Sequence, residues 1–345
     1  MTGIQPSSAA APAPADPGYL ERHLAAISQA AELIRPYIRR TPTLTTELDP
    51  ALRLKPECFQ VTGSFKPRGA FNAVLRASST QPPPKGVLAV SSGNHAQAVA
   101  LAARTAGFPA LILIPEDANP AKVAATRALG AEVITQGVTF ANREARAREL
   151  VESRGLTLIH PFDDWDVIHG QGTAALELLA DVPSLGTVVA PLGGGGLLSG
   201  TALTVKATRP EAAVVGVEPA QADDAYRSFT ARRLETLPAP PTTIADGVRT
   251  VSIGRRNFEV MVEKRLVDAV VTVTEAEIES AVVTAWTRLK LALEPTGALP
   301  LAAYLAAKLP AAAASPGRSD AAPTALILSG GNFDPALVAR LLTSS

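Results

Sequence analysis

Short aliphatic runs alternate with alanine-rich stretches along most of this 345-residue chain, and this alternation restricts the possible folds most strongly. The runs are apolar throughout rather than at every second position, which indicates parallel strands covered on both faces. They lie in the segments 86–92, 110–115, 131–137, 156–162, 187–196, 212–219, 268–274 and 324–330. Regular alternation of such strands with helices predicts an α/β architecture.

Composition excludes several classes of protein. The chain has 32 basic and 32 acidic residues, so its formal net charge is +0 and we expect no binding to nucleic acid. Its single cysteine, Cys58, cannot form an intramolecular disulfide. No apolar run reaches the ~18 residues that span a bilayer, and the N-terminus lacks the features of a signal peptide. We therefore expect a soluble, cytoplasmic protein that does not bind membranes.

One lysine lies in an unusual local setting. Lys66 stands in the sequence TGSFKPRGA, between small residues, where a helix is expected to begin. The positive end of that helix dipole would depress the pKa of the amine and favour Schiff-base chemistry. A solvated surface lysine is the commoner alternative. A second polar segment, SSGNH at 91–95, ends an apolar run and opens a helix, so it suits either a bound carboxylate or an ordinary helix cap.

Two glycine-containing loops follow apolar runs. The first has four consecutive glycines, Gly193, Gly194, Gly195 and Gly196. Their amides can point at one anion, which suits a phosphate at a helix N-terminus. The run lacks both the GK[ST] of a P-loop and the GxGxxG spacing of a dinucleotide site. The second loop, SGGN, begins at Ser329. Because ligands bind beyond the carboxyl ends of parallel strands, these loops and residues 91–95 are expected to meet at one site.

Taken in order, SFKxRGA, SSGNH, GGGGL and SGGN resemble the motifs of the fold type II pyridoxal-phosphate enzymes. Within that group the chain resembles the serine racemase and serine/threonine dehydratase family, from about Tyr37 to about Asp334. The resemblance implies a tryptophan synthase β-like fold with two open, mostly parallel α/β domains. We expect a flexible tail at 1–18, a large domain from 19–84 and 161–345, and a small domain at 85–160 that closes over the substrate.

The resemblance also implies a role for each motif around pyridoxal 5′-phosphate. Lys66 would form the covalent Schiff base with the cofactor, and Phe65 would pack beside its ring. Asn94 would hydrogen-bond the 3′-oxygen, and the four glycines with the Leu197 amide would hold the phosphate. Ser329 would hydrogen-bond the pyridine nitrogen. A hydroxyl does not keep that nitrogen protonated as a carboxylate would, which favours prompt loss of a β-leaving group.

Substrate contacts are implied in the same way. Ser91, Ser92, Asn94 and His95 would surround the substrate carboxylate, and the Lys66 amine would remove the Cα proton. Ser92 would offer a proton on the opposite face of Cα, which permits racemisation without requiring it. Arg143 matches a position that can reach an acidic substrate side group, although a solvated helix arginine is the commoner interpretation.

A divalent cation is implied by the racemase branch of the family. The loop EPAQADD follows an apolar run, and there Glu218, the Ala222 carbonyl and Asp224 would bind Mg²⁺ or Ca²⁺ through oxygen. Without the resemblance, an acidic surface turn would be the simpler interpretation.

The activity implied is dehydration and deamination of L-threonine and L-serine to 2-oxobutanoate or pyruvate and ammonia. Two alternatives stay within the family: serine racemase with elimination as a side activity, and 3-hydroxyaspartate dehydratase or racemase. A non-catalytic binding protein is disfavoured because the lysine and both loops are present, and an NAD-dependent enzyme because the glycine spacing differs. The expected binding partner is a small hydroxy amino acid. The resemblance also implies a homodimer, which is the usual assembly in this family.

Overall fold

The computed structural model describes residues 17–118, 120–310 and 322–343. Helix α1 (Pro17–Ile34) includes the last two residues of the predicted tail, and the rest of that tail lies outside the described residues. Residue 119 and residues 311–321 also lie outside the described ranges. None of the helices in these described ranges has both the length and the apolar character needed to cross a membrane.

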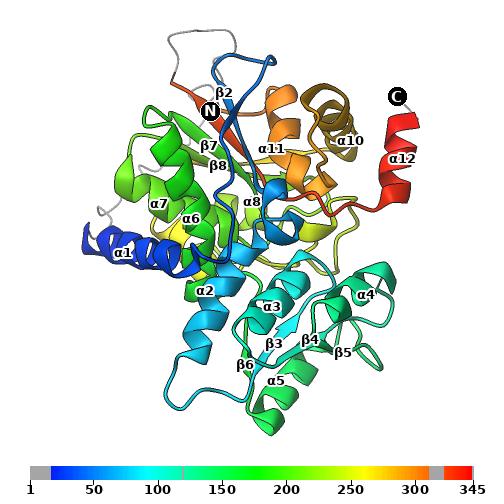
Figure 1. Ribbon diagram of the computed structural model, residues 1–345. Coiled ribbons are helices and arrows are strands. Elements are labelled where there is room, and N and C mark those ends of the chain that lie inside the picture. Colours follow the sequence, from blue (N-terminus) through cyan, green and yellow to red (C-terminus); the bar gives the residue numbers. More distant parts are fainter. Residues whose placement is uncertain (1–16, 119, 311–321, 344–345) are drawn as a thin grey trace, which may run out of the picture.

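A six-stranded sheet forms the larger part of the molecule (Figure 1). In spatial order its strands are β1 (Leu44–Thr45), β2 (Leu52–Pro56), β10 (Thr324–Leu328), β7 (Thr187–Pro191), β8 (Ala213–Pro219) and β9 (Ala269–Val273). Neighbouring strands pair in parallel except β1 and β2, which are antiparallel. The carboxyl ends of the parallel strands therefore meet at one edge of the sheet.

Helices cover both faces of this sheet. One face packs against α1, α6 (Trp165–Asp181), α7 (Gly196–Thr208) and the turn formed by α9 (Arg255–Phe258) and the π-helix η4 (Glu259–Glu263). The other face packs against α10 (Glu275–Thr284), the π-helix η5 (Ala285–Leu289), α11 (Pro295–Leu305) and α12 (Pro335–Thr343). Burial on both faces explains why the strands are apolar throughout.

A second, four-stranded sheet is built from the middle of the chain (Figure 1). Its order is β5 (Glu132–Ile134), β4 (Ala110–Leu113), β3 (Val87–Val90) and β6 (Thr157–Leu158), all parallel. Its helices are α3 (Asn94–Thr105), α4 (Pro120–Ala128) and α5 (Arg143–Arg154). We call these strands and helices the small-sheet unit. Helix α2 (Lys66–Ser78) packs against both α3 and α6, so it lies between the two sheets.

The predicted α/β class is confirmed, and the strands agree with the apolar runs with two clear differences. No predicted run covers β1 and β2, because β2 reads LRLKP and includes two basic residues. The run at 156–162 yields a strand of only two residues, β6. Beyond it the His160 Nδ1 accepts the backbone N–H of Asp163 at 2.9 Å, and Pro161 has no N–H to donate to a sheet. The chain therefore turns away from the sheet at this point, toward the candidate site.

A buried ionic network fixes the start of α2. Arg68 Nε lies 2.7 Å from Glu57 Oε2, and both side chains are fully buried. Arg68 Nη1 also lies 2.8 Å from Glu177 Oε1 on α6, and Lys55 Nζ of β2 lies 2.6 Å from Glu177 Oε2. These pairs connect β2, the 3-10 helix η1 (Glu57–Phe59), α2 and α6 at a point two residues beyond Lys66.

Candidate active site

The Lys66 amine sits at the first residue of α2, as predicted. Its Nζ donates a hydrogen bond to the Pro161 carbonyl at 2.8 Å and lies 5.1 Å from the centroid of the Phe65 ring. Burial lowers the pKa of Lys66 to about 8, and the attraction of Glu294 only partly opposes this shift. The expected depression of the pKa is therefore present, with removal of the amine from water as its main cause.

The four-glycine loop connects β7 to α7 and is packed tightly from behind. A Cβ on Gly194 would lie 2.2 Å from the Phe162 ring, and one on Gly193 would lie 2.9 Å from the Val248 Cα. Gly195 has a φ of +100°, which favours glycine. Within the described residues, the N–H groups of this loop have no hydrogen-bond acceptor. Free amides at a helix N-terminus form a site for an anion such as phosphate.

Ser329 follows β10 and brings the second loop beside Lys66. Its carbonyl accepts the backbone N–H of Phe65 at 3.0 Å. Its hydroxyl is buried, and it has no hydrogen-bond partner within the described residues. A buried hydroxyl without a partner is costly, so this position suits a ligand atom that can accept or donate a hydrogen bond.

Asn94 is held by two side chains at the base of the site. Its Nδ2 donates to Glu294 Oε1 at 2.9 Å, and its Oδ1 accepts from Asn332 Nδ2 at 2.7 Å. Burial, reinforced by the charge of Asp246, raises the pKa of Glu294 to about 8. No sequence motif pointed to Glu294. The only local signal is a lone carboxylate before Pro295, at the start of an apolar helix.

The segment 91–95 forms the N-terminus of α3, at the carboxyl end of β3. Ser91 Oγ accepts the N–H of Gly93 at 3.2 Å, whereas the half-buried Ser92 hydroxyl has no hydrogen-bond partner within the described ranges. His95 lies deeper, with Nε2 2.9 Å from the Ile159 carbonyl. Burial, reinforced by the charge of Lys66, lowers the pKa of His95 to about 3, so the ring is neutral.

Arg143 begins α5 and is half-buried. Its guanidinium lies 3.6 Å from the centroid of the Phe140 ring, and it forms no ion pair with any described residue. Burial lowers its pKa, opposed by Glu144.

Glu218 and Asp224 form a separate buried pair. Glu218 lies near the carboxyl end of β8, and its Oε2 accepts the N–H of Tyr226 at 2.8 Å. Neither carboxylate oxygen of Asp224 has a hydrogen-bond partner in the described part of the chain. Burial and the charge of Asp224 raise the pKa of Glu218 well above its usual value, and burial raises the pKa of Asp224 to about 7. Two buried acids that resist ionisation suit a cation between them.

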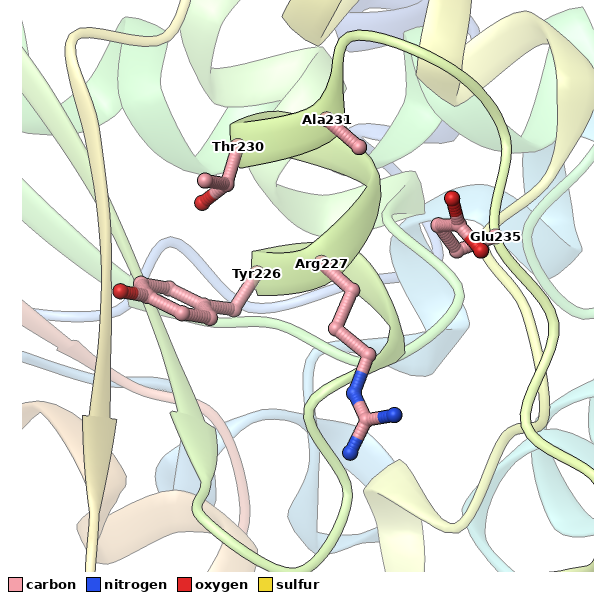
Figure 2. A pocket seen from close by; sticks show the side chains of 5 residues that line it. All are labelled: Tyr226, Arg227, Thr230, Ala231 and Glu235. Carbon is pink, nitrogen blue, oxygen red and sulfur yellow. The ribbon is translucent and has the colours of Figure 1, made fainter.

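This pair needs further oxygen ligands, since no cluster of three or more Asp, Glu, His or Cys side chains occurs among the described residues. Helix α8 (Asp224–Ala231) begins at the pair and carries a surface hollow on its outer side (Figure 2). The hollow is lined by Tyr226, Arg227, Thr230, Ala231 and Glu235. None of these residues belongs to the predicted site, and the hollow is open to solvent.

The structure thus brings most of the predicted residues together. Contacts join Lys66 to Pro161, Phe162 to the glycine loop, and Phe65 to Ser329. Asn94 connects to Asn332 of the second loop. Within the described residues, Glu218 and Asp224 share no hydrogen bond with this group.

Comparison with known proteins places these motifs in context. A family model described as pyridoxal-phosphate dependent enzyme matches residues 34–330. The serine racemase of Arabidopsis thaliana is 42% identical over 313 residues, which cover 89% of this chain and 92% of that protein. An L-threo-3-hydroxyaspartate ammonia-lyase of Pseudomonas sp is 44% identical over 282 residues, 80% of this chain and 87% of that protein. A solved threonine deaminase from T.th. is 50% identical with a TM-score of 0.82, covering 90% of this chain and 98% of that one.

Proposed function

Because this chain belongs to the family of pyridoxal-phosphate dependent enzymes, we propose that it catalyses dehydration and deamination of L-threonine and L-serine. In this β-elimination the amino acid loses its Cα proton and its β-hydroxyl. The enamine that is released then hydrolyses to 2-oxobutanoate or pyruvate and ammonia. The observation that carries the proposal is the Lys66 amine, held 2.8 Å from the Pro161 carbonyl where the two loops meet.

The residues fit pyridoxal 5′-phosphate on three independent observations. The free amides of the glycine loop, with that of Leu197, suit its phosphate. The buried Ser329 hydroxyl, which has no partner among the described residues, suits the pyridine nitrogen. The Lys66 amine would form the Schiff base with the cofactor aldehyde. Phe65 would pack beside the cofactor ring, and Asn94 would hydrogen-bond its 3′-oxygen.

When bound, the cofactor withdraws electrons from the Cα of an attached amino acid. Since the pKa of Lys66 is lowered to about 8, part of its amine is unprotonated near neutral pH and can accept the Cα proton. Ser91, Ser92, Asn94 and His95, with the amides at the start of α3, are proposed to bind the substrate carboxylate.

Racemisation of serine is the second candidate, and the Ser92 hydroxyl favours it. This hydroxyl is half-buried and has no hydrogen-bond partner within the described ranges, so it is available to give a proton to Cα. Removal of the Cα proton by Lys66 on one face and return of a proton by Ser92 on the other would invert the configuration at Cα. Loss of the β-hydroxyl after the first step would instead lead to the elimination product.

A 3-hydroxyaspartate dehydratase or racemase is the third candidate, and Arg143 favours it. The Arg143 guanidinium is half-buried against Phe140 and has no carboxylate partner among the described residues. A guanidinium in this setting gains from a carboxylate that it can bind in two hydrogen bonds, and the second carboxylate of hydroxyaspartate would supply one.

We further propose that Glu218, Asp224 and the Ala222 carbonyl hold Mg²⁺ or Ca²⁺. The support is the pair of buried acids and the unpartnered oxygens of Asp224 within the described residues. These are hard oxygen donors, and water or further oxygen atoms would complete the six or more ligands that such cations take. The cation would offset the cost of burying two like charges.

The organisation of the molecule completes the proposal. Residues 19–84 and 161–345 are proposed to form one domain, and residues 85–160 a second that closes over the substrate. Action as a cytoplasmic homodimer is proposed from the resemblance alone.

A product assay distinguishes the three candidates. The holoenzyme is incubated separately with L-serine, L-threonine and 3-hydroxyaspartate in the presence of Mg²⁺, and 2-keto acids, ammonia and D-serine are measured together. Pyruvate and 2-oxobutanoate with little D-serine are the expected result. Predominant D-serine would support the racemase. Oxaloacetate as the main product would support the hydroxyaspartate enzyme, and Arg143→Lys would then raise KM for that substrate alone.

A further inference from the structure

An ion pair connects the small-sheet unit to the larger sheet near the site. Lys122 Nζ on α4 lies 2.5 Å from Asp246 Oδ2 on the short helix η3 (Asp246–Val248). The two side chains are 29% and 47% exposed, so the pair is only partly screened by water. The position of Asp246 therefore affects the position of the small-sheet unit relative to the larger sheet.

The residues after Asp246 pack against the candidate site. The Gly247 N–H donates to Thr296 Oγ1 at 3.0 Å, two residues beyond Glu294. Val248 lies directly behind the glycine loop, where its Cα would be 2.9 Å from a Cβ on Gly193. This short segment, residues 246–250, is thus in contact with both the proposed phosphate loop and α11.

The same segment ends at the buried acid pair. The Thr250 hydroxyl is buried without a hydrogen-bond partner in the described part of the chain, and so are both carboxylate oxygens of Asp224. The residues that follow Thr250 run beside α8: the Ser252 Oγ donates to the Glu235 carbonyl at 2.8 Å, and the Glu235 N–H donates to Ser228 Oγ at 2.9 Å, one helical turn after Asp224. A hydroxyl and a carboxylate that lie close together, both buried and both unpartnered, form an oxygen-lined place for a ligand. Hydroxyl and carboxylate oxygens are donors that Mg²⁺ and Ca²⁺ accept.

We propose that Thr250 belongs to the cation site, and that cation binding is coupled through residues 246–250 to the Lys122–Asp246 ion pair. The cation draws Thr250 toward Asp224 and so fixes the segment that carries Asp246. Fixing Asp246 favours the position of the small-sheet unit in which Lys122 pairs with it. The inference rests on the cation part of the proposed function, and it adds a ligand-shell residue and a regulatory consequence to it.

Coupling between two sites is reciprocal, so it can be measured from either end. If the cation favours the ion pair, then loss of the ion pair must weaken cation binding by the same factor. Because the Lys122–Asp246 pair is partly exposed, this factor is at most about fivefold. Loss of a side chain in the ligand shell has a larger effect, about tenfold or more in cation affinity.

The test is hydrogen exchange of the holoenzyme, followed by mass spectrometry during a Ca²⁺ titration. Peptides from 218–226 report binding at the cation site, and peptides from α4 report the small-sheet unit. In the wild type we expect Ca²⁺ to protect both. Thr250→Val keeps the shape of the side chain and should weaken Ca²⁺ binding about tenfold, whereas Thr250→Ser keeps the hydroxyl and should stay near the wild type.

Asp246→Asn isolates the coupling step. In this variant Ca²⁺ should still protect 218–226, with affinity reduced up to about fivefold, but should no longer protect α4. Wild-type protection of 218–226 without protection of α4 would overturn the coupling. Equal Ca²⁺ affinity in Thr250→Val and the wild type would remove Thr250 from the site. Absence of any protection at 218–226 would refute the cation site and the inference together, while keto-acid formation tests the elimination activity independently.

Discussion

Arg68 offers a quantitative test of what holds the lysine in place. Its guanidinium bonds Glu57 at 2.7 Å and Glu177 at 2.8 Å, and the Arg68 and Glu57 side chains are fully buried. Arg68→Met would leave Glu57 as a buried carboxylate without its partner, whereas Glu177 would keep Lys55. Breaking a buried pair from one side costs about 3–5 kcal/mol, and this is the loss we expect in the free energy of unfolding.

Urea denaturation of the holoenzyme measures this loss, and Arg233→Met is the matched control. Arg233 pairs with Glu235 at 2.6 Å, but its side chain is 78% exposed, so its removal should cost less than about 1 kcal/mol. Adding Glu57→Gln to Arg68→Met should restore about 1 kcal/mol or more, because the uncompensated charge is removed. A loss below about 1 kcal/mol for Arg68→Met alone would refute the reasoning.

Three further predictions concern the site and its surroundings. Gly194→Ala places a Cβ 2.2 Å from the Phe162 ring and therefore displaces the glycine loop. An absorbance titration should show pyridoxal phosphate binding weakened about tenfold or more, and unchanged affinity would contradict the close packing of this loop. Ser92→Ala should lower the ratio of D-serine to pyruvate at least about tenfold in the product assay, and an unchanged ratio would exclude Ser92 as a proton donor. His23 of α1 and His169 of α6 form a pair in which Nδ1 of His23 lies 2.8 Å from Nε2 of His169. Burial lowers the pKa of both histidines to about 4, so the unfolded chain binds protons first as pH falls. Stability should therefore decline below about pH 6.5, and the decline should be smaller in His169→Ala; an identical urea-midpoint profile in that variant would argue against the histidine pair as its source.

Local signals account for what the sequence could predict. The strands follow from the apolar runs, and the ends of α3 and α4 follow from Gly107 and Gly130, whose φ values are +65° and +92°. The glycine loop and Lys66 were found because several unusual residues stand side by side in the chain. The family resemblance then joined them into one site.

Long-range contacts account for what the sequence could not predict. Glu294 meets Asn94 across 200 positions of sequence, and no local pattern marks Glu294 as a partner of the predicted Asn94. The same is true of Lys122 and Asp246, which come from different parts of the fold and are each ordinary charged residues by sequence. Burial and pairing, rather than residue type, give these groups their properties. Only the folded structure supplies that information.

The central claim is that Lys66 carries the cofactor, and borohydride reduction of the holoenzyme tests it most directly. Reduction fixes the bond between a lysine and pyridoxal phosphate, and peptide mass spectrometry then locates it. We predict the cofactor mass on the peptide that contains Lys66, and loss of both this mass and keto-acid formation in Lys66→Ala. Cofactor attached to another lysine in the wild type, or full activity in Lys66→Ala, would contradict the account.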